Sequence, residues 1–179
     1  MKRFMWLIPA VLIVFSCPKA QAQTQETPEW DISGGYSYLK ANLGGSSFNL
    51  NGGSTSATEY LNSWIGGRVE INTYQGGVSG INVSAQTVTY GPVFSYRHYD
   101  KITPFAHVQL GAIHASQGYL GISESAFKFA MTSGGGVDVK INQWAAIRLQ
   151  ADYLMTRFLT LRQDNVQGSV GLVVHFGKK

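Results

Sequence analysis

The sequence predicts an all-β protein, an eight-stranded antiparallel up-and-down transmembrane β-barrel. The clearest indication is residues 127–141, where odd positions carry mostly Phe, Met, Val and Ile and even positions carry Lys, Thr, Gly and Asp. This period of two gives a strand one apolar face and one polar face. Strands of globular domains usually have about 5–6 residues, whereas bilayer-crossing strands need about 9–11. Charged residues make up only 13% of the chain and aromatic residues 12%, which fits a wall that faces lipid.

The first 22 residues have the features of a cleaved export signal. Lys2 and Arg3 precede an apolar run, and Ala20 and Ala22 supply small residues before a cut after Ala22. The apolar run is too short to anchor the chain across a bilayer. Cys17, the only cysteine, lies in a segment that loosely resembles a lipoprotein cleavage site. Lipidation at Cys17 is therefore the alternative to cleavage after Ala22.

Past the signal we expect a short N-terminal segment at 23–29, one barrel domain at 30–176 and a tail at 177–179. No later window holds about 18 consecutive apolar residues, so no membrane helix is predicted. The formal net charge is +4, but Lys2, Arg3 and Lys19 lie in the signal. The mature chain is therefore nearly neutral, and nothing in it indicates a nucleic-acid partner.

Turn signals divide the barrel region into eight expected strands. These are 30–41, 49–61, 64–73, 83–98, 103–116, 125–141, 144–157 and 166–176. Two of the short turns repeat one plan, in which Asn62 and Asn142 each precede a Trp by two residues and an Arg follows four residues after that Trp. Longer polar or Gly-rich connections are expected at 42–48, 74–82, 117–123 and 159–165. Short turns at one rim and longer loops at the other are typical of bacterial barrels.

The strand faces distinguish two kinds of barrel. A soluble barrel buries its apolar face and exposes charge, and a membrane barrel does the opposite. The apolar faces here are bulky and aromatic, while the polar faces are rich in Gly, Ser, Thr and Ala, which suits a narrow interior. The residues expected at the membrane interfaces are Trp30, Tyr60, Trp64, Trp144, Tyr153 and Phe176. The membrane form is the better prediction, and a soluble ligand-binding barrel is the alternative.

Together, the export signal, the Gly34-Gly35-Tyr36-Ser37-Tyr38 opening strand, the amphipathic strands and the closing run at 170–176 resemble the small outer-membrane β-barrel family. This group includes the OmpA transmembrane domain and OmpX. The resemblance covers about residues 30–176 and implies insertion by the barrel-assembly machinery, which is thought to read a terminal aromatic residue. Here Phe176 is followed by Gly177-Lys178-Lys179. We expect no peptidoglycan-binding domain after the barrel.

Charged residues gather on the polar strand faces. They are Arg68, Glu70, Arg97, Lys128, Asp138, Lys140, Arg148 and Asp152. Side chains fill the interior of an eight-stranded barrel, and charges there must pair because an isolated buried charge is costly. We expect an interlocking ion-paired core that joins neighbouring strands. The functional alternative is a narrow ion path or gate.

Few residues indicate chemistry. The four histidines lack metal-ligand spacing, so no metal and no cofactor is predicted, and His107 and His175 are expected to point inward as polar filler. His114 and Ser116 share a face and loosely resemble the His-x-Ser of outer-membrane lipid A deacylases, although rim residues without catalytic function are the simpler interpretation. Residues 134–136 are three glycines inside an alternating strand, which indicates a bend or close packing rather than a phosphate site.

These observations predict a non-enzymatic protein of the bacterial outer membrane with a structural or surface-interaction role. A narrow pore and a deacylase-like enzyme acting on lipid A are the alternatives. Expected partners are outer-membrane lipid and lipopolysaccharide, the barrel-assembly machinery during insertion, and an unidentified surface partner that would bind the longer loops.

Overall fold

The computed structural model describes residues 28–43, 46–78, 81–119, 122–158 and 161–177. The expected signal peptide at 1–22 lies outside these residues, as do most of the segment at 23–29 and of the tail at 177–179. These divisions of the chain stay predictions. Within the described residues, no helix is long and apolar enough to cross a membrane.

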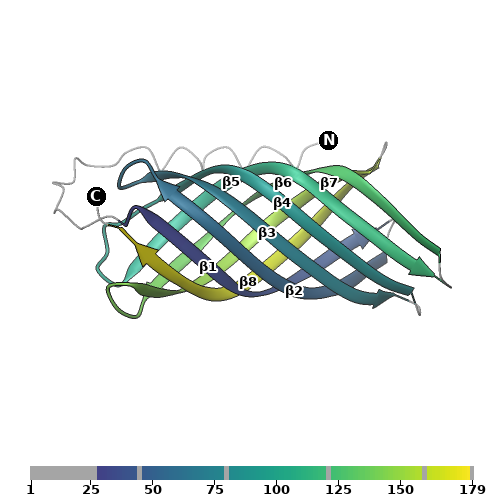
Figure 1. The fold of residues 1–179 in the computed structure, drawn as a ribbon, viewed down its shortest axis with the longest axis horizontal. Helices are drawn as coiled ribbons and strands as arrows, with labels where there is room; N and C mark the ends of the chain where they lie inside the picture. Colours follow the sequence, from purple (N-terminus) through teal and green to yellow (C-terminus); the bar gives the residue numbers. More distant parts are fainter. Residues whose placement is uncertain (1–27, 44–45, 79–80, 120–121, 159–160, 178–179) are drawn as a thin grey trace, which may run out of the picture.

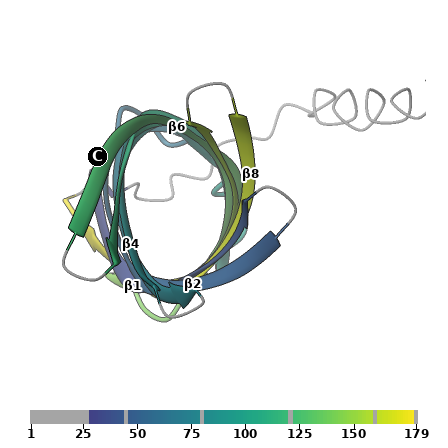
Figure 2. The same ribbon diagram turned by 90° about the vertical axis from the view of Figure 1, so that its right-hand side faces the viewer.

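Eight strands form the fold. They are β1 (Trp30–Leu43), β2 (Ser46–Tyr60), β3 (Ile65–Val78), β4 (Ile81–Ser95), β5 (Ile102–Tyr119), β6 (Ile122–Lys140), β7 (Ala145–Phe158) and β8 (Leu161–Phe176). Each strand pairs antiparallel with the next along the chain, and β8 pairs with β1 from Trp30↔Phe176 to Lys40↔Val166. The sheet therefore closes on itself, as the view along the barrel in Figure 2 shows. The predicted fold class is confirmed.

Short turns connect the strands at the end where β1 begins and β8 finishes (Figure 1). Asn62 Oδ1 accepts hydrogen bonds from the backbone N–H groups of Trp64 and Ile65, at 3.1 and 3.0 Å. Asn142 Oδ1 accepts one from the N–H of Trp144 at 2.9 Å. Asn side chains favour turns because they can satisfy backbone groups two residues further on. The two turns that are similar in sequence thus have the same local structure.

At the opposite end, the strands run through most of the ranges predicted as longer loops. The ladder between β1 and β2, for example, continues to the pair Leu43↔Ser46. Only positions 44–45, 79–80, 120–121 and 159–160, which lie outside the described residues, separate the paired strands. The prediction of long loops is wrong because ladder hydrogen bonds satisfy the backbone whatever the side chains are. Polar and Gly-rich composition therefore did not end these strands.

The three consecutive glycines, residues 134–136, lie within β6. A Cβ atom on Gly134 or Gly136 would overlap the backbone of β7, and one on Gly135 would overlap the backbone of β5 at Phe105. Both neighbouring strands therefore approach β6 too closely for a side chain, and this part of the interpretation is confirmed.

The strand faces point as predicted for a membrane barrel. Tyr90 and Leu172 lie on the outer wall with 64% and 58% of their surface exposed, whereas Arg148 and Asp138 in the interior are 4% and 5% exposed. An outer wall of large apolar side chains around a charged interior cannot belong to a barrel that is solvated by water on its outside.

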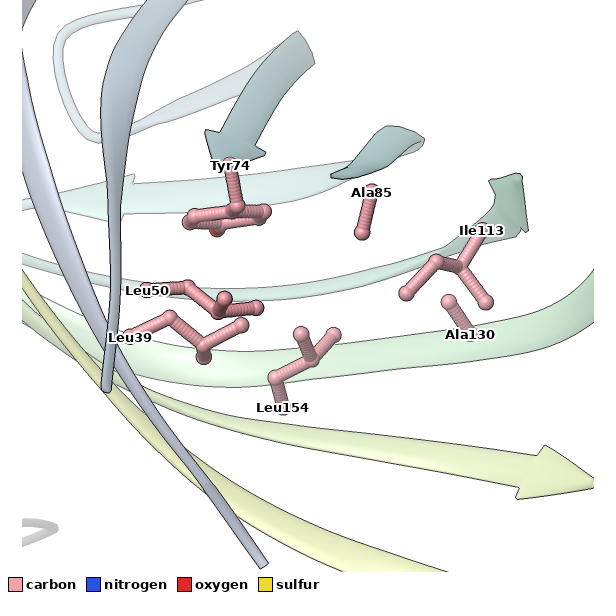
Figure 3. Packing of buried hydrophobic residues seen from close by; sticks show 7 residues of the cluster. All are labelled: Leu39, Leu50, Tyr74, Ala85, Ile113, Ala130 and Leu154. Atoms are coloured by element: carbon pink, nitrogen blue, oxygen red, sulfur yellow. The ribbon is translucent and has the colours of Figure 1, made fainter. Parts of the chain in front are cut away.

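The interior also holds one apolar layer, near the end opposite the short turns. It contains one residue from each of seven strands, β1 to β7: Leu39, Leu50, Tyr74, Ala85, Ile113, Ala130 and Leu154. Figure 3 shows these side chains directed toward one another inside the barrel. We call them the apolar layer. Between this layer and the short turns, the lumen is mainly polar.

Candidate functional site

The structure collects most of the predicted interior charges in the lumen. Five of them are buried: Arg68, Glu70, Asp138, Arg148 and Asp152. Arg97 and Lys128 are only partly buried. Lys140 is exposed, and its assignment to the interior was wrong. It is the last residue of β6, so its side chain lies at the mouth of the barrel, where water solvates the ammonium group.

The strongest ion pair joins neighbouring strands β6 and β7. Arg148 donates from Nε to Asp138 Oδ1 at 2.7 Å and from an Nη atom to Asp138 Oδ2 at 2.8 Å. This two-point geometry matches the planar guanidinium to the carboxylate. The two residues are direct register partners, which is why alternation alone places both of them in the lumen.

A second acidic group, Asp31, lies at the seam where β1 meets β8. Its Oδ1 atom is 2.6 Å from His175 Nδ1, and the two residues are register partners. Its Oδ2 atom lies 3.9 Å from Arg97 and 4.0 Å from Arg148. Polar side chains from β1, β7, β8 and the turn that follows β4 therefore meet at the short-turn end of the lumen and link the two terminal strands to the rest of the barrel.

The two arginines of the repeated turn plan converge on one aromatic ring. The guanidinium carbons of Arg68 and Arg148 each lie 4.7 Å from the centre of the Phe105 ring, and the ring of His107 stacks on Phe105 at 6.2 Å. Cation–π attraction strengthens when the groups are removed from water. Phe105, which breaks the polar pattern of its strand face in the sequence, thus provides the surface on which two buried cations pack.

A chain of polar contacts continues toward the apolar layer. His107 Nε2 lies 3.1 Å from Asp152 Oδ1, and Asp152 accepts a 2.7 Å hydrogen bond from the Gln150 amide. The same Gln150 amide nitrogen lies 3.3 Å from both Glu70 oxygens. Asn72 donates to Glu70 at 3.1 Å. Gln150 therefore bridges two buried carboxylates.

Sequence reasoning missed the amides and hydroxyls of this network. Gln150, Gln167 and the carboxylate Asp31 belong to it as well, and none of the three was predicted from the sequence as a member of an interior network. Thr58, which accepts from Arg68 Nε at 2.9 Å, was not singled out. In the sequence, these residues are marked only by their position on an inward strand face. The tilt of the strands decides which of their side chains come into contact.

Of the six aromatic residues predicted at the membrane interfaces, five are exposed or partly exposed. Trp30, Trp64, Trp144 and Phe176 are exposed on the outer wall, and Tyr153 is partly exposed. Tyr60 is only 1% exposed, so its assignment to the interface was wrong. It occupies an inward position on β2, where its hydroxyl lies 3.2 Å from Ser95 Oγ and Arg97 packs 4.4 Å from its ring centre.

The catalytic alternative rests on His114 and Ser116. His114 lies partly exposed on β5, and the side chain of Ser116 lies outside the described residues. Their possible pairing stays a prediction. Among the described residues, no group of three or more His, Cys, Asp or Glu side chains is arranged to hold a metal ion.

Comparison with known proteins identifies the family. A model of the outer membrane protein β-barrel domain matches residues 8–176. No curated protein sequence matches the chain significantly. Among solved structures, Neisserial surface protein A is similar with a TM-score of 0.74 at 13% identity, covering 83% of this chain and 97% of that one.

Two further barrels have the same fold. Ail, the attachment invasion locus protein of Yersinia pestis, has a TM-score of 0.62 at 20% identity, covering 84% of this chain and 99% of that one. The N-terminal β-barrel domain of Pseudomonas aeruginosa OprF has a TM-score of 0.63 at 10% identity, covering 85% and 100%. At these identities the likeness shows the fold alone, whereas the family match covers most of the sequence. The chain belongs to the family of outer membrane protein β-barrel domains.

Proposed function

We propose that this outer-membrane barrel is non-enzymatic and acts in binding at the cell surface, through strand edges that rise beyond the part of the wall that faces lipid. The supporting observation concerns β6. This strand begins at Ile122, but its ladder with β7 begins only at Phe129↔Arg157. Over residues 122–128 the backbone pairs with β5 on one side, and no described strand pairs with it on the other.

An unpaired strand edge presents a row of N–H and C=O groups that can accept another strand. Extended peptides bind such edges by main-chain hydrogen bonds, with specificity from alternate side chains. The N–H of Lys140 points toward β5 and that of Ile141 toward β7. Since the direction alternates along an uninterrupted register, Ser125 has its N–H and C=O on the free side.

Other partners follow from the location of the protein. Its outer wall contacts outer-membrane lipid, and lipopolysaccharide is the proposed lipid partner around the strands that leave the bilayer. The barrel-assembly machinery is the proposed partner during insertion. A structure of Ail was determined in complex with the heparin analogue sucrose octasulfate, which makes sulfated glycans one class of ligand to test here.

The test compares cells that lack the protein with cells that carry it as wild type or as Ser125→Pro. Proline removes the N–H on the free edge and leaves the pairing with β5 intact. Retention of the cells on immobilised heparin and on a panel of purified extracellular proteins is measured. We expect the wild type to increase protein binding and Ser125→Pro to abolish the increase. Equal retention of all three strains would refute the proposal.

Two assays address the alternative functions. If the protein removed acyl chains, mass spectrometry of lipid A would show a species that is present with the wild type and absent with Ser116→Ala. We expect identical lipid A spectra. If the wild type were an open pore, it would produce conductance steps in planar bilayers, and we expect none because the apolar layer crosses the lumen.

A further inference from the structure

The lumen is asymmetric below the apolar layer. The inward side chains of β8, β1 and β2 are small there and include Ser33, Ser54, Ser56 and Ser169, whereas the opposite side carries buried Arg68, His107 and Gln109. A cavity of about 10 Å³ lies against the serine-rich side, and Glu70 and Arg148 also line it. This is room for about one water molecule among several polar partners.

The two charged groups that line this cavity have different kinds of partner. Arg148 is paired at two points with Asp138. The hydrogen-bond donors to the Glu70 carboxylate are the amides of Asn72 and Gln150. Among the described residues, no Lys, Arg or His nitrogen lies within 4.0 Å of Glu70. Of the two charged groups that line the cavity, Glu70 is therefore the one without an ion-pair partner within 4.0 Å in the described part of the chain, and its carboxylate can bind water or a small monovalent cation there.

The apolar layer covers this cavity on one side. From the cavity, β1 continues from Ser33 to Leu39, β2 from Ser54 to Leu50, and β7 from Gln150 to Leu154. The layer takes members from seven strands and so extends across the lumen. Apolar constrictions exclude ions because water leaves them. On the short-turn side, the described residues at the end of the lumen are polar and include Asp31, Arg97 and His175. The apolar group there, Tyr60, Val93 and Phe105, involves only β2, β4 and β5 and does not extend around the lumen.

We propose that the serine-lined cavity is part of a path for water and small cations, and that the apolar layer is its gate. The barrier to ions then lies in Leu39, Leu50 and Leu154 and not in the charged network. The charged network holds the strands together, and Glu70 gives the path its preference for cations. This inference concerns the lumen and is independent of strand addition at the β6 edge.

The experiment measures conductance in planar bilayers. Wild type and Asp138→Asn are expected to give no steps, because the gate is intact in both. The double variant Leu39→Ser/Leu154→Ser is expected to give discrete steps. Under a KCl gradient of about 0.1 M, where screening is incomplete, its reversal potential should be cation-selective. Adding Glu70→Gln to the double variant should move the reversal potential toward zero while the steps remain.

Folding is checked for every variant by the migration shift between boiled and unboiled samples on a cold gel. The matched control is Val166→Ser/Leu172→Ser, which makes the same kind of change on the outer wall and should give no steps. A folded Leu39→Ser/Leu154→Ser barrel without conductance would overturn the proposal, and so would conductance in Asp138→Asn. If the double variant does not fold, Leu50→Ser alone is judged by the same outcomes.

Discussion

The part of the barrel that faces lipid and the part at the end opposite the short turns differ in which strand face is apolar. The outward face is apolar in the first part and the inward face in the second. Single strands pass through both parts. On β1, Tyr36 and Tyr38 face outward while Ser33 and Ser37 face the lumen; the next two residues are Leu39, buried, and Lys40, exposed. Side chains alternate between the two faces along the whole strand. The apolar face is the outer one up to Tyr38 and the inner one beyond it. The strand is built for lipid over most of its length and for water beyond Tyr38.

The same inversion occurs on β4. Val88 is exposed and Thr87 buried, but two residues nearer the hairpin end Gln86 is exposed and Ala85 buried. Because the solvent outside decides which face must be apolar, we infer that the wall leaves the bilayer near this change. It also explains the apolar layer, which forms where the outer wall no longer supplies contact with lipid and an apolar core is needed inside.

The largest expected effect comes from the interior charge network. Asp138→Ala leaves the Arg148 guanidinium buried without its two-point partner, and we expect a loss of about 3–5 kcal/mol in the free energy of unfolding. The control is Lys140→Ala on the same strand, where an exposed side chain should change this free energy by less than about 0.5 kcal/mol. Denaturant unfolding in detergent or lipid measures both. Similar losses for the two variants would show that Asp138 is solvated.

A lysine scan of the outer wall locates the boundary between the two parts. Leu172→Lys places an ammonium in lipid, at an expected cost of about 2–4 kcal/mol if Leu172 lies near the middle of the bilayer. Gln86→Lys lies on the side of this polarity change that is farther from the short turns, and it should change the free energy of unfolding very little. Both variants are unfolded by denaturant in lipid vesicles. Equal costs at the two positions would contradict the division of the wall proposed here.

The smallest expected effect tests the inward position of Tyr60. Tyr60→Phe removes a hydroxyl that lies 3.2 Å from Ser95 Oγ but keeps the ring against Arg97, so we expect a loss of about 1 kcal/mol. Trp64→Phe, a change on the outer wall, is the comparison and should alter intrinsic fluorescence more than the free energy of unfolding. No loss for Tyr60→Phe would argue that the tyrosine hydroxyl already meets water.

The fold was predictable from the sequence because period-two patterning and the connections between strands are local signals. Two kinds of error came from the ends of strands. The ranges near 42–48 and 117–123 were expected to be loops because they are polar, although a ladder tolerates polar residues. The predicted environments of Lys140 and Tyr60 were wrong because both residues lie at a rim of the barrel. There, a shift of one residue along the strand decides whether a side chain meets the lumen, the membrane interface or water.

Local patterning was enough to predict the strand count and the strand face of most of the interior charges, since side-chain direction along a strand follows from position alone. Which inward residues come into contact depends on the assembled barrel. Closure and strand tilt bring Arg68 and Arg148, from strands far apart in the chain, to one phenyl ring and assemble seven side chains from seven strands into a layer. Such contacts depend on the register around the whole barrel, which no single strand encodes.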